Sequence, residues 1–147
     1  MNTTNVDTLD RTIQETNVWL KAVAHHLETD ERRLSFTALR AVLHALRDRI
    51  GPENAVHLGA QLPMLIRGLY YEGWHMAGTL TKERHREQFL DHVRWTFGPR
   101  VDLDAERMTR AVFDVLWEKI DPGEVAKVIK MLPEELRELW PAVARES

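Results

Sequence analysis

The chain contains no cysteine. This absence excludes disulfides, thiolate nucleophiles and cysteine-ligated zinc or iron–sulfur sites. The sequence also has no apolar run approaching the roughly 20 residues that a membrane-spanning helix needs. The first ten residues, "MNTTNVDTLD", have neither a basic region nor an apolar core, so they do not predict a secretory signal. We therefore expect a cytoplasmic protein that has no membrane partner.

Positive charge is scarce as well. The 20 lysines and arginines are outnumbered by 23 aspartates and glutamates, which gives a formal net charge of -3. A nucleic-acid-binding protein usually gathers cations on one surface, because phosphate contacts dominate its affinity. Short cationic pairs such as Arg32 and Arg33 stand beside carboxylates instead. We expect no nucleic-acid partner, and DNA binding through a helix-turn-helix is only the third hypothesis for function.

The remaining composition is that of an ordinary globular protein. The chain has 147 residues, of which 44% are hydrophobic and 29% are charged. A chain of this length is typical of one domain that buries about two thirds of its unfolded surface. The sequence therefore predicts a single domain over residues 1–147.

An internal repeat organises this domain. Shifted by 70 positions, residues 40–70 align without a gap on residues 110–140, and ten of the 31 positions are identical. The identities include the pairs Pro52/Pro122, Pro63/Pro133 and Arg67/Arg137. Because such self-similarity marks a repeated structural unit, we predict two copies at about 17–70 and 87–140, joined by a linker at about 71–86.

Each copy has helical periodicity. In the first copy, one stripe of a 3.6-residue period carries Phe36, Leu39, Val42, Leu43, Leu46 and Ile50. Arg40, Arg47, Asp48 and Arg49 fall largely off this stripe, so we expect them away from the core. Ser35, which precedes the apolar run, is interpreted as a helix N-cap.

Helix boundaries follow from glycine, proline and capping residues. Gly51 has the place of a glycine that ends a helix. In "DPGE", Asp121 is expected to cap a helix whose first residue is Pro122. Pro63 and Pro133 should each interrupt their segment. The predicted fold class is all-α, a compact helical bundle of two pseudo-repeated multi-helix halves with about eight helical segments. We expect it to pack through the second long helix of each copy and the closing helix of the first.

Several phrases resemble a known family. These are "LPMLIRGLYYEGW", "LPEELRELWP" near the C-terminus, and "LYYEGWH" followed by "TKERH". They resemble the uncharacterised bacterial family catalogued as domain of unknown function 2267, over about residues 17–141. The resemblance implies a small all-α bacterial protein built from two related halves, and it implies no activity.

Histidines and carboxylates offer few candidate metal sites. Glu72 and His75 form an E-x-x-H step, which places both side chains on one helix face as in di-iron bundles, but such sites need two of these steps. His85 and His92 are two turns apart, about 10 Å along a helix, which is too far for one ion. We interpret their face as solvated or interfacial, and we expect His44 on a helix surface. The prediction is that no metal and no cofactor is bound.

Catalytic motifs are also missing. The sequence has no G-x-S-x-G elbow, no phosphate-binding glycine loop and no H-E-x-x-H. Serines are few, so a hydroxyl nucleophile is not favoured. We expect no catalytic residues, and the sequence favours a protein that is not an enzyme.

The end of the first copy differs from the end of the second. Glu134, Glu135 and Glu138 align with Met64, Leu65 and Gly68. We therefore predict that the face of Met64, Leu65 and Leu69 is shielded by the second copy or by a second chain, and that Gly68 lets another helix approach closely. Arg67 and Arg137 should each bond carboxylates or helix-terminal carbonyls of their own copy.

Two functional hypotheses follow. The first is a non-enzymatic helical interaction or scaffolding module that binds a protein partner or self-associates. The alternative is a small-molecule or metal-binding protein with a pocket near the seam between the copies. The residues named for an interface or pocket are Leu65, Gly68, Tyr70, Tyr71, Glu72, Trp74, His75, His85 and Trp117.

Overall fold

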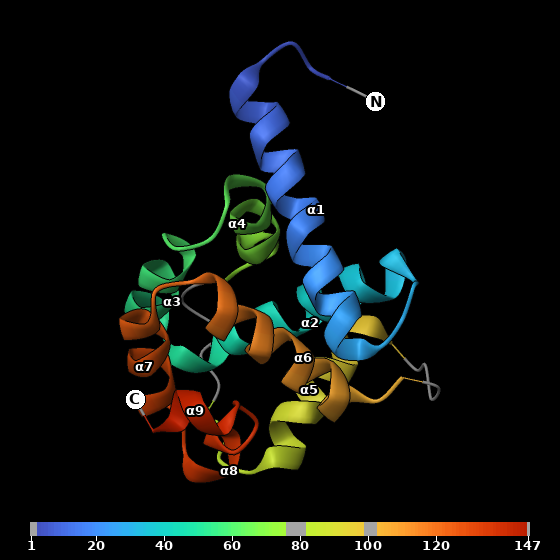
Figure 1. Cartoon of the computed structure of the whole chain (residues 1–147). Helices are drawn as coiled ribbons and strands as arrows, with labels where there is room; N and C mark the ends of the chain where they lie inside the picture. Colours follow the sequence, from blue (N-terminus) through green and yellow to red (C-terminus); the bar gives the residue numbers. More distant parts are fainter. Residues whose placement is uncertain (1–2, 76–81, 99–102, 147) are drawn as a thin grey trace.

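The described part of the chain is entirely helical, as predicted. The computed structural model describes residues 3–75, 82–98 and 103–146, and within these ranges it contains nine α-helices and no strand (Figure 1). The helices are α1 (Asp7–Leu27), α2 (Arg32–Ile50), α3 (Pro52–Gly59), α4 (Met64–Tyr71), α5 (Arg86–Phe97), α6 (Ala105–Lys119), α7 (Pro122–Lys130), α8 (Glu134–Arg137) and α9 (Ala142–Arg145). In these ranges, no helix combines the length and apolar character that crossing a bilayer needs.

Helix α2 lies at the centre of the molecule. It contacts α1, α3, α4, α5 and α6, and every residue from Ala41 to Asp48 is buried. The periodicity therefore misplaced Arg47 and Asp48, which were expected away from the core. Phe36 was expected in the core but is 43% exposed near the start of the helix. From Ala41 to Asp48 the helix has no solvent face, so one apolar stripe does not describe the burial of this part.

Most helix ends are those that the sequence predicts. Asp121 caps α7 by accepting a hydrogen bond from the backbone N–H of Glu124, and Pro122 is the first helical residue. Gly51 ends α2 with a φ of 86°, a backbone conformation that glycine adopts without strain. Ser35 is an exception, because α2 already begins at Arg32 and the Ser35 hydroxyl donates to the Glu31 carbonyl from inside the helix. The serine is therefore not an N-cap.

The core continues through both halves. Helix α1 packs on α2 and α6, and α2 packs on α5 and α6. The expected packing of the second long helices, α2 and α6, is thus present. Helix α4 instead has its main contacts with α1, α2 and α3, so the expectation that this closing helix joins the two halves is wrong.

The first half of α1 extends beyond the other helices (Figure 1). Its exposed apolar residues are Val6, just before the helix, Leu9 and Ile13, and their spacing places them on one face. The second half of α1 enters the core, where Trp19 is 4% exposed. One helix therefore serves both as a core element and as a projecting wall.

Candidate functional site

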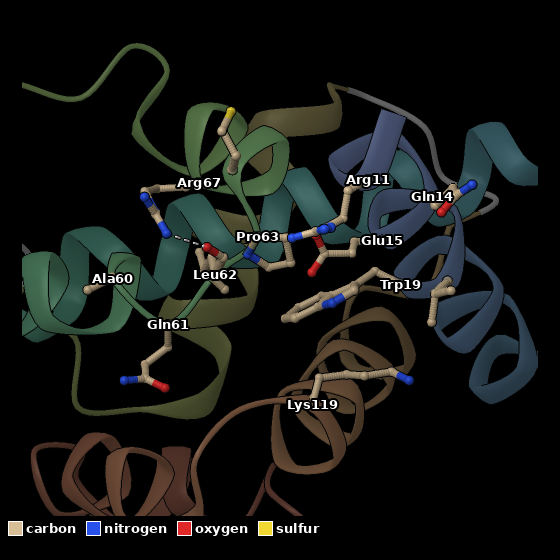
Figure 2. A pocket seen from close by; sticks show the side chains of 12 residues that line it. Arg11, Gln14, Glu15, Trp19, Ala60, Gln61, Leu62, Pro63, Arg67 and Lys119 are labelled. Atoms are coloured by element: carbon tan, nitrogen blue, oxygen red, sulfur yellow. Dashed lines mark hydrogen bonds between the residues drawn. The ribbon is translucent and has the colours of Figure 1, made fainter. Parts of the chain in front are cut away.

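Two concave surfaces flank the start of α4. One is an apolar groove between α1, α2 and α4, with a volume of about 600 Å³. The other is a pocket between α1, the α3–α4 connection and the end of α6, with a volume of about 750 Å³ (Figure 2). We call them the apolar groove and the cationic pocket. Met64, the first residue of α4, lines both.

The apolar groove is lined mainly by hydrocarbon. Its walls include Leu9 of α1, Phe36 of α2, and Met64, Leu65 and Leu69 of α4. Met64 is 50% exposed and Leu65 is 49% exposed. Large apolar side chains gathered in one exposed concavity mark a binding surface more often than scattered ones do.

The polar groups along the groove are already engaged. The Thr12 hydroxyl accepts a hydrogen bond of 2.9 Å from the backbone N–H of Leu65, and the Thr16 hydroxyl donates to the Thr12 carbonyl. Glu72 accepts a hydrogen bond of 3.4 Å from Arg40. These side chains therefore hold the groove together, which leaves its open surface suited to an apolar occupant.

Gly68 leaves a gap in the groove wall. A Cβ atom built on Gly68 would meet no atom within 4 Å. The second copy therefore does not shield the face of Met64 and Leu65, and no helix of the described chain approaches Gly68 closely. The prediction that the second copy shields this face is therefore wrong. Shielding by a second chain stays a prediction.

The C-terminal end of α4 is fixed to α2 by buried polar side chains. Arg47 donates hydrogen bonds to the carbonyls of Tyr70 and Glu72, at 2.9 and 3.1 Å. His44 donates one of 2.7 Å to the carbonyl of Leu69. His44 is 7% exposed, not on the surface as expected, and burial lowers its pKa. These bonds satisfy carbonyls that a helix end leaves unpaired.

An ionic network extends from this anchor to the second half of the chain. Asp48 accepts a hydrogen bond from Arg47 and lies 3.3 Å from His92 of α5. His92 also contacts a carboxylate oxygen of Glu83 at 3.0 Å, and Arg49 donates to the Glu83 carbonyl. The network therefore ties α2, α5 and the segment before α5 together. The sequence did not predict this network, because Arg47, Asp48 and Arg49 were expected away from the core.

The network shifts the pKa of two members. Burial alone would raise the pKa of Asp48, but hydrogen bonds from His92 and Arg47 outweigh it, so the pKa is lowered. Hydrogen bonds to Asp48 and Glu83 raise the pKa of His92 to about 9, despite its burial. The histidine is thus a cation near neutral pH, held between two carboxylates.

The predicted aromatic residues lie behind the groove. Tyr70 is buried, and its hydroxyl donates to the carbonyl of Ala55. Tyr71 packs against Gly59, and its ring stacks on Trp74 with centroids 5.5 Å apart. We interpret this aromatic cluster as support for α4.

The other predicted residues lie elsewhere. His85 precedes α5, and its Nδ1 lies 2.8 Å from a carboxylate oxygen of Glu135 in α8. Trp117 is partly buried against the core on α6, and His75 is exposed after α4. Of the residues named from the sequence, Leu65, Gly68 and Glu72 line the apolar groove together. The linker residues 76–81 fall outside the described ranges.

Positive charge dominates the cationic pocket. Arg11 and Glu15 of α1, Arg67 of α4 and Lys119 at the end of α6 line it around the indole of Trp19, as Figure 2 shows. No local sequence pattern marks this site, because its residues come from three separate segments. Of the residues that line the pocket, only Arg67 was singled out in the sequence, because Arg137 occupies the matching position 70 residues later.

That arginine has the predicted structural role in both halves. Arg67 donates to the carbonyls of Gly59 and Leu62, and Arg137 donates to those of Leu132 and Lys130. Each guanidinium therefore holds the turn that precedes its own helix. The prediction for the pair is confirmed.

The described side chains do not assemble a recognisable metal centre. No group of three or more histidine, aspartate or glutamate side chains within residues 3–75, 82–98 and 103–146 could hold an ion. Glu72 instead pairs with Arg40, as described above.

Comparison with known proteins identifies the family. A family model described as "Uncharacterized conserved protein (DUF2267)" matches residues 16–139. The chain belongs to this family. No curated protein matches it in sequence.

The DUF2267 match includes most of the helical body but not the projecting part of α1. It begins at Thr16, so Leu9, Arg11 and Thr12 precede it. Both concave surfaces therefore combine residues inside the family match with residues outside it. Of the α1 residues that line the two surfaces, Thr16, Val18 and Trp19 lie inside the match.

Proposed function

We propose that this protein is a non-enzymatic helical interaction module that self-associates through the apolar groove. The observation that carries this proposal is the exposure of Met64 and Leu65 in a groove whose lining polar side chains are engaged within the chain. Apolar contact is then the main interaction left to an occupant. An amphipathic helix provides it by laying its apolar face into such a groove.

The occupant we propose is the projecting half of α1 from a second copy. Val6, Leu9 and Ile13 form an exposed apolar stripe there, and Leu9 also lines the groove. The stripe and the groove are thus parts of one continuous surface. A two-fold dimer uses the same surface on both subunits, so each chain can cover the groove of the other with its own α1.

Analytical ultracentrifugation over a concentration series tests this proposal. We expect the wild-type protein to form a dimer and Leu65→Glu to weaken its association by at least about tenfold, because the dimer would bury an unpaired carboxylate. Met131→Glu is a matched control, since Met131 is 48% exposed on the second half of the chain. The control should dimerise like the wild type.

Three results would contradict the proposal. A wild-type protein that stays monomeric at concentrations well above the micromolar range has no self-association to explain. A Leu65→Glu protein that dimerises normally places the interface elsewhere. Equal weakening by Leu65→Glu and Met131→Glu indicates nonspecific association of apolar surface.

We also propose that the two halves are copies of one structural unit. Helices α3 and α7 begin at Pro52 and Pro122, and α4 and α8 follow Pro63 and Pro133. Helix contacts occur in corresponding pairs, α1 with α6 and α5 with α2, and α1 with α4 and α5 with α8. An experimental structure tests this by superposing residues 35–71 on 105–141. Different helix directions after superposition would contradict the duplication.

A further inference from the structure

The cationic pocket gathers charges that the protein itself does not neutralise. Arg11 and Lys119 have no hydrogen bond or ion pair with any described residue. By contrast, Arg40, Arg86 and Arg110 on the surrounding helices each pair with a carboxylate. Glu15 is the single acidic residue of the pocket, so three cations face one anion. The pocket therefore has an excess of positive charge.

One of these cations is held in place before any ligand arrives. Nε of Arg67 donates to the Gly59 carbonyl and its Nη2 donates to the Leu62 carbonyl, each at 2.9 Å. The guanidinium is fixed by these two bonds, whereas its Nη1 has no partner among the described residues. A planar cation held in this way can receive a carboxylate or phosphate oxygen with little loss of side-chain entropy.

The base of the pocket also contains an unused donor. The indole of Trp19 points into the pocket in Figure 2 and the residue is 4% exposed. Its N–H makes no hydrogen bond within the described ranges, and it is not among the buried unpaired polar atoms there, which belong to Thr109 and Trp140. The nitrogen therefore reaches solvent, so an anionic ligand in the pocket can accept its hydrogen bond.

From these observations we infer that the cationic pocket binds a small, multiply charged anion that carries phosphate or carboxylate groups. Arg11 and Lys119 flank the indole of Trp19 in Figure 2, and Arg67 is a third cation of the lining, beyond Pro63. Among the described residues of the second half, the depression beside Arg137 also contains Lys130 and Arg145, but Glu134 and Glu138 line it too, so its charge is more nearly balanced. This inference is independent of self-association through the apolar groove.

Isothermal titration calorimetry of the full chain with pyrophosphate, and separately with citrate, tests the inference. We expect the wild-type protein to bind at least one of them with one site per chain. Arg11→Gln and Lys119→Gln should each weaken binding by about tenfold, the usual effect of losing one charged hydrogen bond. Lys21→Gln is the matched control, because it removes one exposed charge from α1 outside the pocket. It should change the affinity less than about twofold.

A second measurement locates the ligand. The indole N–H resonance of Trp19, assigned as the one that disappears in Trp19→Phe, should shift when the anion is added. Stronger binding of pyrophosphate indicates a phosphate ligand, and stronger binding of citrate a carboxylate one. The inference is overturned if neither anion binds, if Lys21→Gln weakens binding as much as Lys119→Gln, or if the Trp19 resonance does not move. Leu65→Glu should bind the anion normally, so this result and the dimerisation result are separable.

Discussion

Nε2 of His92 lies 3.3 Å from Oδ2 of Asp48, which joins α5 of the second half to α2 of the first. The other ring nitrogen of His92 contacts Glu83 at 3.0 Å. The imidazole therefore bridges two carboxylates at the junction of the halves. This position makes it a source of pH-dependent stability.

The stability should fall as the pH rises above neutrality. The folded pKa of His92, about 9, exceeds its ordinary value of 6.5, so the histidine's contribution is complete below pH 6.5 and is lost as the pH passes through 9. The loss should be about 3 kcal/mol. Urea unfolding of the wild type and His92→Gln between pH 6 and 10 measures it, and the slope should be smaller in the variant. If the free energy of unfolding falls equally steeply with pH in the wild type and in His92→Gln, His92 is not the cause of the pH dependence. His57→Gln, at an exposed position, is the control.

Substitution of Arg67 or of Arg137 should change the free energy of unfolding by a similar amount. Lysine lacks the planar fork that bonds two carbonyls, so Arg67→Lys and Arg137→Lys should each lower the free energy of unfolding by about 1 kcal/mol. Only Arg67→Lys should also weaken anion binding in the calorimetric titration. An unchanged melting temperature in either variant would contradict the structural role of that arginine.

Thr12 of α1 should stabilise the start of α4, although Leu65 lies 53 residues later in the chain. Thr12→Val keeps the side-chain shape but removes the acceptor for the Leu65 N–H, so we expect a loss of about 1 kcal/mol and faster hydrogen exchange of that amide. Thr16→Val is the control, because its hydroxyl only donates to a helix carbonyl that has other partners available. Equal effects of the two substitutions would show that the Thr12 bond has no special role.

The two glycines near the groove should respond in opposite ways to alanine. Gly68→Ala places its methyl group in open space, so the monomer should gain about 0.5–1 kcal/mol while the dimer weakens. In Gly59→Ala the new Cβ would lie 2.7 Å from Cζ of Tyr71, and we expect a loss of about 1–3 kcal/mol. Thermal unfolding and ultracentrifugation measure both effects. A destabilised Gly68→Ala monomer would mean that the gap is filled within the chain.

The sequence predicted the features that depend on local chemistry. Pro63 and Pro133 precede new helices and Asp121 caps α7, since backbone restrictions and capping chemistry act over a few residues. The identity at the matching positions Arg67 and Arg137 also predicted that both arginines have the same structural role.

The sequence did not predict features that depend on how helices surround one another. Arg47 and Asp48 are buried because α2 has neighbours on all sides, and their partners come from α4 and α5. The same reason places His92 in a network instead of on a solvated face. The cationic pocket combines α1, α4 and α6, and no local pattern records that these segments meet.

The part of α1 before Thr16 contributes to both concave surfaces. It lies outside the family match, yet it supplies Leu9 to one concave surface and Arg11 to the other. The opposite walls belong to the helical body. Under the proposed roles of the two surfaces, substitutions in this short leading segment would change the apolar contact through Leu9 or the charge at Arg11, while most of the core would keep its packing.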